Sequence, residues 1–190
     1  MTVERSDAPV ACDAKLAKPG KAISRARPSP MTSSLPLLAL DGIFYRAVDP
    51  AFRDTALCGS RRPGRYSASG QPTLYLSSSP EGVDAAMIAH RGNRSQALEL
   101  LRVRVTANRI FDLRDPEARR LANVSLDQAT APWQDAVSQG RTPASWAVRN
   151  CLESLGAQGL VDPSRKVPGL WHLVLFAWSR DDAAKATILE

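Results

Sequence analysis

Two arginines, two tyrosines and one serine are the residues of this chain whose types could do chemistry. Arg46 and Arg65 could bind a ligand with two phosphates, because a guanidinium group makes bidentate, charge-assisted hydrogen bonds to phosphate oxygens. Tyr66 and Tyr75 each add an aromatic face and a polar tip. Ser164 lies in GLVDPSRKVPGLWHLVLF, between two apolar runs that already have Pro and Gly for a turn. The five residues are therefore candidates for a site that binds a ligand with two phosphates.

Each of these residues also has a purely structural interpretation. A strand arginine such as Arg46 commonly lies on a solvated face, and Arg65 is one of several basic residues in its loop. Tyr75 stands between two leucines, as a core tyrosine does, and Ser164 could cap a turn. Taken one by one, the residues leave both interpretations open.

Alternating and β-branched stretches predict the strands that position these residues. Arg46 falls within GIFYRAV at 42–48, and a loop rich in Gly, Arg and Ser at 58–72 leads to the strand TLYLS. Ser79, Pro80 and Glu81 form a good helix start.

The second half of the chain predicts strands and short helices in alternation. A helix beginning at Thr142-Pro143 should end at Gly156. Its apolar stripe should consist of Trp146, Ala147, Cys151, Leu152 and Leu155. The pattern as a whole predicts an α+β fold with a compact mixed or antiparallel sheet and short flanking helices. The remaining elements are strands at 101–105, 110–113, 159–162 and 170–178, and short helices within 115–122 and 125–134.

Length and charge predict one domain with two tails. The 190 residues are 44% hydrophobic and carry a formal net charge of +6, of which a large share lies in the N-terminal segment. We expect a disordered basic tail at 1–36, a single domain at 37–180 and a polar tail at 181–190. No basic helix or zinc finger accompanies the charge, so direct nucleic-acid binding is disfavoured.

Several common site classes are excluded by their missing signatures. The sequence has no GxGxxG after a strand, no GxxxxGK[ST], no HExxH and no GxSxG. Three widely spaced cysteines and two histidines without acidic clusters predict neither a disulfide framework nor a metal site. The apolar run LPLLAL is too short to span a bilayer, so we expect a cytoplasmic protein without membrane insertion.

The order of three blocks resembles the RES-domain family of bacterial toxin–antitoxin toxins. The blocks are FYR, PGRYSASGQPTLYLSSSPE and GLVDPSRKVPGLWHLVLF, and the resemblance covers about residues 42–178. It implies a fold similar to the ADP-ribosyltransferase (diphtheria-toxin-like) fold, with NAD+ as substrate and 37–180 as an NAD-binding domain.

The resemblance also assigns roles to individual residues. It implies that Arg46, Tyr75 and Ser164 are catalytic, and that these three bind NAD+ together with Arg65 and Tyr66. The family's glutamate in the helix after LYL falls on Ala86, if the family's histidine one turn later is His90. His172 stands where the family commonly has an Asn-like residue.

The reaction implied is cleavage of the nicotinamide glycosidic bond of NAD+. A mono-ADP-ribosyltransferase with a bacterial protein acceptor is the first alternative, and an NAD+ hydrolase or phosphorylase is the second. A catalytically inactive NAD- or partner-binding member is the third, because of Ala86, and a basic binding module that uses the tail is the fourth. The implied partner is a cognate antitoxin, through which alone nucleic acid would be contacted.

Overall fold

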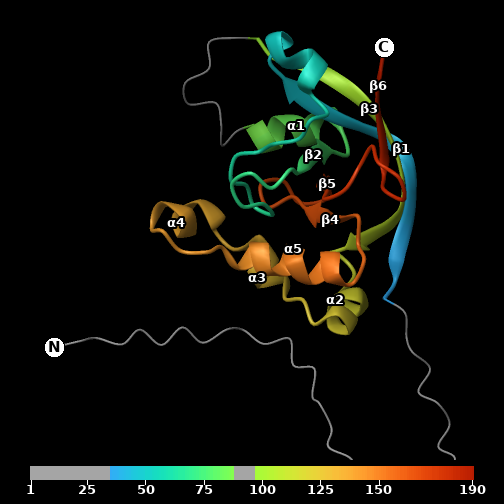
Figure 1. The fold of residues 1–190 in the computed structure, drawn as a ribbon. Coiled ribbons are helices and arrows are strands. Elements are labelled where there is room, and N and C mark those ends of the chain that lie inside the picture. The colour runs from blue at the N-terminus through green and yellow to red at the C-terminus, as the bar shows by residue number, and fades with distance from the viewer. Residues whose placement is uncertain (1–34, 88–96) are drawn as a thin grey trace, which may run out of the picture. The chain divides into compact units, whose positions relative to one another are not determined.

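Five strands close into a ring in the computed structural model, which describes residues 35–87 and 97–190 (Figure 1). The hydrogen-bonded order is β1-β2-β5-β4-β3-β6, and an additional pairing of β1 with β3 closes the first five strands. The strands are β1 (Leu37–Val48), β2 (Leu74–Ser77), β3 (Glu99–Asp112), β4 (Gly159–Pro163), β5 (Trp171–Leu175) and β6 (Lys185–Leu189).

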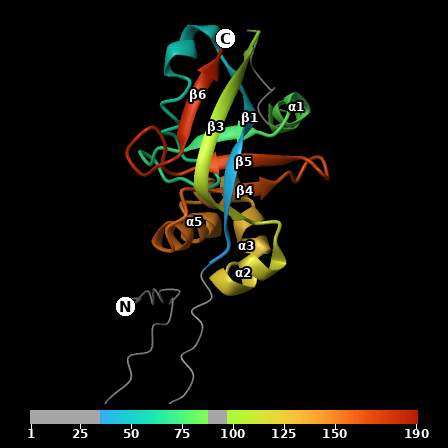
Figure 2. The same cartoon turned by 90° about the vertical axis from the view of Figure 1, so that its right-hand side faces the viewer.

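The sheet is mixed, as the sequence predicts. Only β3 and β4 pair in parallel among the described strands, and the other pairings are antiparallel. Figure 2 shows β1, β3 and β6 running together along the molecule, with β4 and β5 crossing them. Together with the short helices, this arrangement confirms the α+β class.

The described helices are short, and α1, α2, α3 and α5 begin close to where the sequence predicts, whereas α4 and η1 were not predicted. Asp115 caps α2 by accepting from the backbone N–H groups of Glu117 and Ala118. α5 begins after Pro143, and Gly156 follows its end with φ +84°, a conformation that favours glycine. The helices are α1 (Pro80–Met87), α2 (Pro116–Ala122), α3 (Leu126–Thr130), α4 (Trp133–Ser138) and α5 (Ala144–Ser154), with a 3-10 turn η1 (Pro50–Thr55).

The ring separates two apolar cores because strand side chains alternate between faces. Leu173 and Leu175 of β5 belong to the inner core, which side chains from all five ring strands fill. Val174 points the other way, into an outer core shared with Leu160 of β4 and Leu152 of α5. Helices α2, α3 and α5 gather beside β4 and cover this outer face (Figure 1).

Two expectations about the ends of the chain have different outcomes. The polar tail predicted at 181–190 is wrong, because Lys185–Leu189 forms β6 and pairs with β3. This segment forms hydrogen bonds to backbone groups at the edge of β3 that would otherwise be unpaired. The hydrophobic pattern of a short segment does not reveal such a distant pairing partner. The tail predicted at 1–36 lies almost entirely outside the described residues.

Other local predictions need only small changes. The two strands predicted at 101–105 and 110–113 are one continuous strand, β3, and the run LPLLAL leads into β1. No helix in the described ranges is long and apolar enough to cross a membrane.

A glycine at the β4–β5 pairing gives a test of this packing. A Cβ at Gly159 would lie 2.3 Å from the Val174 carbonyl oxygen and 3.1 Å from the Leu175 Cα, both backbone atoms that cannot rotate away. We expect Gly159→Ala to lower the free energy of unfolding by about 3 kcal/mol, measured by urea denaturation.

Gly42→Ala is the matched control for this substitution. Its Cβ would meet the Phe44 side chain at an ordinary 3.5 Å. The expected change is below about 1 kcal/mol. Equal losses in the two variants would contradict the close approach of β4 and β5.

Candidate active site

Helix α5 holds the loop that precedes β2 by its backbone. Trp146 Nε1 donates to the Gly64 carbonyl at 2.8 Å, and Ser145 Oγ donates to the next carbonyl, that of Arg65. Arg149 Nη1 donates to the third, that of Tyr66, at 3.0 Å. Three consecutive carbonyls are thus fixed by side chains of one helix, so the direction of the Arg65 and Tyr66 side chains is set by α5.

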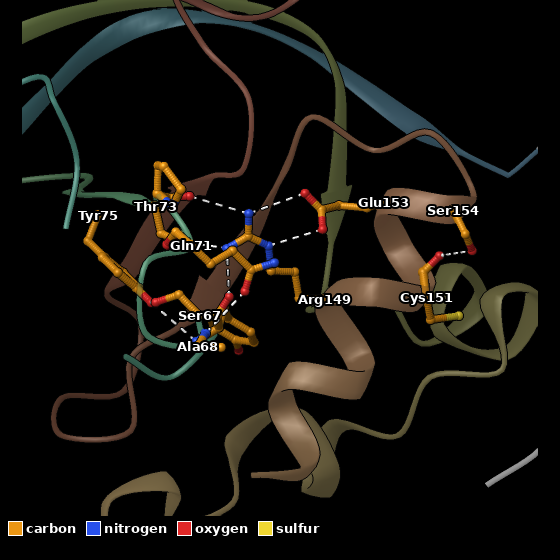
Figure 3. A network of polar contacts seen from close by, with 11 residues as sticks. Ser67, Ala68, Gln71, Thr73, Tyr75, Arg149, Cys151, Glu153 and Ser154 are labelled. Carbon is orange, nitrogen blue, oxygen red and sulfur yellow. Dashed lines mark hydrogen bonds and ion pairs between the residues drawn. The ribbon is translucent and has the colours of Figure 1, made fainter. Parts of the chain in front are cut away.

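Ser145, Trp146 and Arg149 of α5 thus form a clamp on the loop, and Arg149 is its centre (Figure 3). It is 2% exposed, and it also donates to Thr73 Oγ1 at 2.6 Å and to the Pro72 carbonyl at 3.3 Å. Glu153 balances its charge with two contacts of 3.2 Å, and the Phe176 ring centroid lies 4.8 Å from its guanidinium carbon. The buried cation therefore joins the middle of the loop and its C-terminal end to helix α5, and it packs on Phe176, which follows β5.

Tyr75 reaches from β2 into the same loop. Its hydroxyl accepts from the Tyr66 N–H at 3.1 Å and lies 3.3 Å from Ser67 Oγ. A Cβ at Gly64 would stand 2.6 Å from this hydroxyl oxygen, so only glycine lets the loop pass so close. Burial raises the pKa of Tyr75, and the phenol stays protonated.

Arg65 and Tyr66 converge on a buried carboxylate, Asp162 of β4. The Tyr66 hydroxyl donates to Asp162 Oδ1 at 2.9 Å, and Arg65 Nε lies 3.9 Å from Oδ2. Arg65 also donates to the Ala131 carbonyl at 3.1 Å. Burial raises the pKa of Asp162 to about 6, against the opposing effects of the Arg65 charge and the Tyr66 hydrogen bond.

Asp162 belongs to a polar row across three strands. It is the register partner of His172 on β5, which is in turn the partner of Ser77 on β2. Directly paired side chains lie on one face, and Ser77 Oγ is 3.0 Å from His172 Nδ1. Burial, and then the charge of Arg65, lowers the pKa of His172, so the imidazole is neutral at pH 7.

Arg46 lies on the opposite face of the sheet from this row. It shares the face of Phe44, which belongs to the inner core, yet its Nη1 reaches the Tyr75 carbonyl at 2.9 Å. Its Nε is buried without a hydrogen-bond partner in the described part of the chain. Such an unsatisfied donor is costly, and an acceptor supplied by a ligand would relieve it.

Ser164 continues the face of Asp162 beyond β4. Its N–H donates to the Leu170 carbonyl at 2.8 Å, so the antiparallel pairing extends one residue past Pro163. Its Oγ accepts from the Val167 N–H at 3.2 Å and thereby also caps the turn. Accepting this bond leaves the hydroxyl its own hydrogen to donate to a ligand.

The five residues named from the sequence are therefore brought together only in part. Arg65, Tyr66 and Tyr75 form one contiguous set, Ser164 lies on the face of Asp162, and Arg46 approaches from the other side of β2. Tyr66 has no exposed surface, whereas Tyr75 is partly exposed. Of the two rings proposed to stack on a ligand, only Tyr75 offers a surface in this structure.

α1 contributes no carboxylate at the expected position. Ala86 is exposed, and the buried face of the helix is formed by Gly82, Val83 and Ala85. His90 lies outside the described residues. Within the described ranges, no group of His, Cys, Asp and Glu could hold a metal ion.

Sequence reasoning missed Asp162 and Arg149. An acid after the apolar run Gly159–Val161 is a signal for the first, because a charge in such a strand needs partners. The second has no such signal. The stripe predicted for α5 is only partly right, because Leu152 is buried but Leu155 is exposed. The other buried residues of the helix are Ser145, Val148 and Arg149, two of which are polar and bond the loop.

Comparisons with known proteins give a family and a fold. The sequence matches the RES domain over residues 42–189. The fold is similar to a chain of the M. tuberculosis MbcT–MbcA toxin–antitoxin complex, with a TM-score of 0.53 and 19% identity over 80% of this chain and 86% of that chain. No curated protein matches the chain.

The clamp predicts a large cost for removing Arg149. In Arg149→Met, the Tyr66 and Pro72 carbonyls and the Thr73 hydroxyl oxygen lose a charged donor in the interior. Buried groups left without partners cost about 1–3 kcal/mol each, so we expect the free energy of unfolding in urea to fall by about 3–5 kcal/mol.

Arg120→Met is the control, because Arg120 also pairs with a glutamate on its own helix. That pair is 67% and 59% exposed, and its loss should cost at most about 1 kcal/mol. A loss for Arg149→Met as small as for Arg120→Met would show that α5 does not hold the loop.

Proposed function

Because the chain belongs to the RES domain family, we propose that it is the toxin of a bacterial toxin–antitoxin pair and that it uses NAD+ as substrate. The observation that carries the proposal is that Arg65 of the loop held by α5 and Tyr75 of β2 meet at that loop, beside the face that bears Ser164. These are the positions that the family resemblance assigns to NAD+ binding.

The two arginines would neutralise the pyrophosphate of NAD+. Arg65 is held at its Nη1 and fixed in direction by α5, and Arg46 has a buried donor that lacks an acceptor. A preorganised guanidinium loses little freedom when it binds phosphate. Tyr75 would stack on the nicotinamide or its ribose, and Ser164 would donate to a ribose or amide oxygen.

The reaction proposed is cleavage of the bond between the ribose C1′ and the nicotinamide nitrogen. The bonding electron pair leaves with neutral nicotinamide, and positive charge develops on the ribose, as in glycoside cleavage. A nucleophilic acceptor then bonds to C1′ and releases a proton. We favour a side chain of a bacterial protein as acceptor, because a bound protein can compensate for a weak site better than water or phosphate can.

The α+β fold with its mixed sheet is compatible with an ADP-ribosyltransferase-like architecture, which is part of this proposal. The solved complex pairs a toxin with an antitoxin, which supports an antitoxin as partner of this chain. We infer that the pair acts in the cytoplasm, where NAD+ is available, and that the antitoxin covers the site.

The proposal is tested with the purified chain, freed of antitoxin, and NAD+ labelled in its adenylate part. Nicotinamide release and label on protein are followed together in bacterial lysate. Label on a discrete protein supports the transferase, and release without protein label identifies a hydrolase or phosphorylase. Binding of NAD+ without release supports the inactive member that Ala86 favours, and neither binding nor release overturns the use of NAD+.

Arg65 gives the sharpest variant of this experiment. Arg65→Ala removes a positioned charge from the phosphates, so kcat/KM for nicotinamide release should fall about 10²–10³-fold. Arg62, three residues earlier, is exposed, and Arg62→Ala should leave the rate within about twofold because exposed charges contribute little. Equal effects of the two substitutions would contradict a specific role of Arg65 and would show that NAD+ responds only to the total positive charge of the loop.

A further inference from the structure

Asp162 is a buried acid with no part in the NAD+ contacts proposed for Arg46, Arg65, Tyr75 and Ser164. It is 9% exposed, and carboxylates are rarely so buried unless they are paired. Oδ1 accepts the Tyr66 hydrogen bond at 2.9 Å, but the 3.9 Å from Oδ2 to Arg65 Nε is an ion-pair distance beyond hydrogen-bond reach. Oδ2 therefore keeps the capacity to accept a hydrogen bond from another group.

An ion pair that serves only to stabilise the fold is expected to bring its nitrogen and oxygen atoms within hydrogen-bond distance. In the same chain, the side chain of Arg114 meets Asp112 with two hydrogen bonds, of 2.9 and 2.7 Å. The Arg65–Asp162 pair is more buried and looser, which is an unfavourable way to stabilise a fold, because desolvation is incurred without the compensating bonds. Burial also raises the pKa of Asp162 to about 6, a perturbation typical of acids with a functional role.

The position of Asp162 fits the proposed substrate. It lies beside Arg65, which would hold the pyrophosphate, and two residues before Ser164 on the same face, which would hold the nicotinamide ribose or amide. A carboxylate between these two groups lies where the ribose next to the pyrophosphate would be. α1, by contrast, has an alanine at the position where the family resemblance expects the acid.

We propose that Asp162 is the catalytic carboxylate of this site and that it replaces an acid on α1. The inference rests on the proposed use of NAD+. Oδ2 accepts a hydrogen bond from a ribose hydroxyl, and the negative charge stabilises the cation that forms at C1′ as the electron pair leaves with nicotinamide. The carboxylate itself forms no bond to carbon, and the acceptor's proton passes to solvent.

The inference predicts a pH dependence of kcat/KM for nicotinamide release. The charged or titratable side chains that face the carboxyl are Arg65 and Tyr66 from the loop and His172 from β5. Burial, and then the charge of Arg65, lowers the pKa of His172, so this residue is neutral on the plateau at pH 7. The ionised form of Asp162 is the active one, so kcat/KM, which reports the pKa of the free protein, should rise as the pH increases through about 6 and reach a plateau above 7.

The test is Asp162→Asn in the full chain, which keeps the shape and an acceptor for Tyr66. We expect kcat for nicotinamide release to fall about 10²–10³-fold and the rise near pH 6 to disappear. The Kd for NAD+, measured by calorimetry, should be unchanged or lower, because the removed charge no longer competes with the phosphates for Arg65. Asp41→Asn is the control, since Asp41 pairs with Arg104 and both side chains are about half exposed.

A second variant tests the role of Asp162 without removing its charge. Tyr66→Phe removes the hydrogen bond that stabilises ionised Asp162, so the rise of kcat/KM should move to higher pH. An unchanged kcat in Asp162→Asn, or a pH profile that neither variant moves, overturns the role of Asp162 while NAD+ turnover by the wild type stands. A wild type that neither binds nor cleaves NAD+ overturns the proposed function and this inference with it.

Discussion

The buried guanidinium of Arg149 is the interaction on which the candidate site depends. It bonds to the loop before β2 at Tyr66, the residue after Arg65, and at Pro72 and Thr73, where the loop ends. A loop without secondary structure of its own would otherwise sample many conformations, at a cost in ordering entropy for each ligand bound. Because the bonds from Arg149 already order the loop in the folded protein, ligand binding does not have to order it.

The closed ring of strands explains why polar groups can gather on one side of β2, β4 and β5. Side chains from all five strands fill the interior of the ring with apolar groups, which leaves the alternate positions of the same strands facing the helices. Most of these positions form a second apolar core, but at one end the row turns polar with Ser77, His172 and Asp162. An aliphatic residue at the position of Asp162 would avoid the cost of burying a charge. The carboxylate therefore indicates a functional role more than a contribution to the stability of the fold.

Much of the fold could be predicted from the sequence because its signals are local. Capping residues such as Asp115 and the alternation in β3 are properties of a few neighbouring residues. β6 could not be predicted, since five residues become a strand only when β3 provides an edge. The buried face of α5 was missed for a related reason: Ser145 and Arg149 are buried by carbonyls some 80 residues earlier in the chain.

The central claim is that α5 presents Arg65 to a phosphate-bearing ligand, and side-chain NMR of the arginines tests it most directly. ADP-ribose, which cannot be turned over, is titrated into the 15N-labelled protein while the arginine Nε–Hε signals are recorded. The account predicts saturable shifts at Arg65 and Arg46, with the exposed Arg61 and Arg62 unaffected. Shifts confined to Arg61 and Arg62, or none at Arg65, would contradict it.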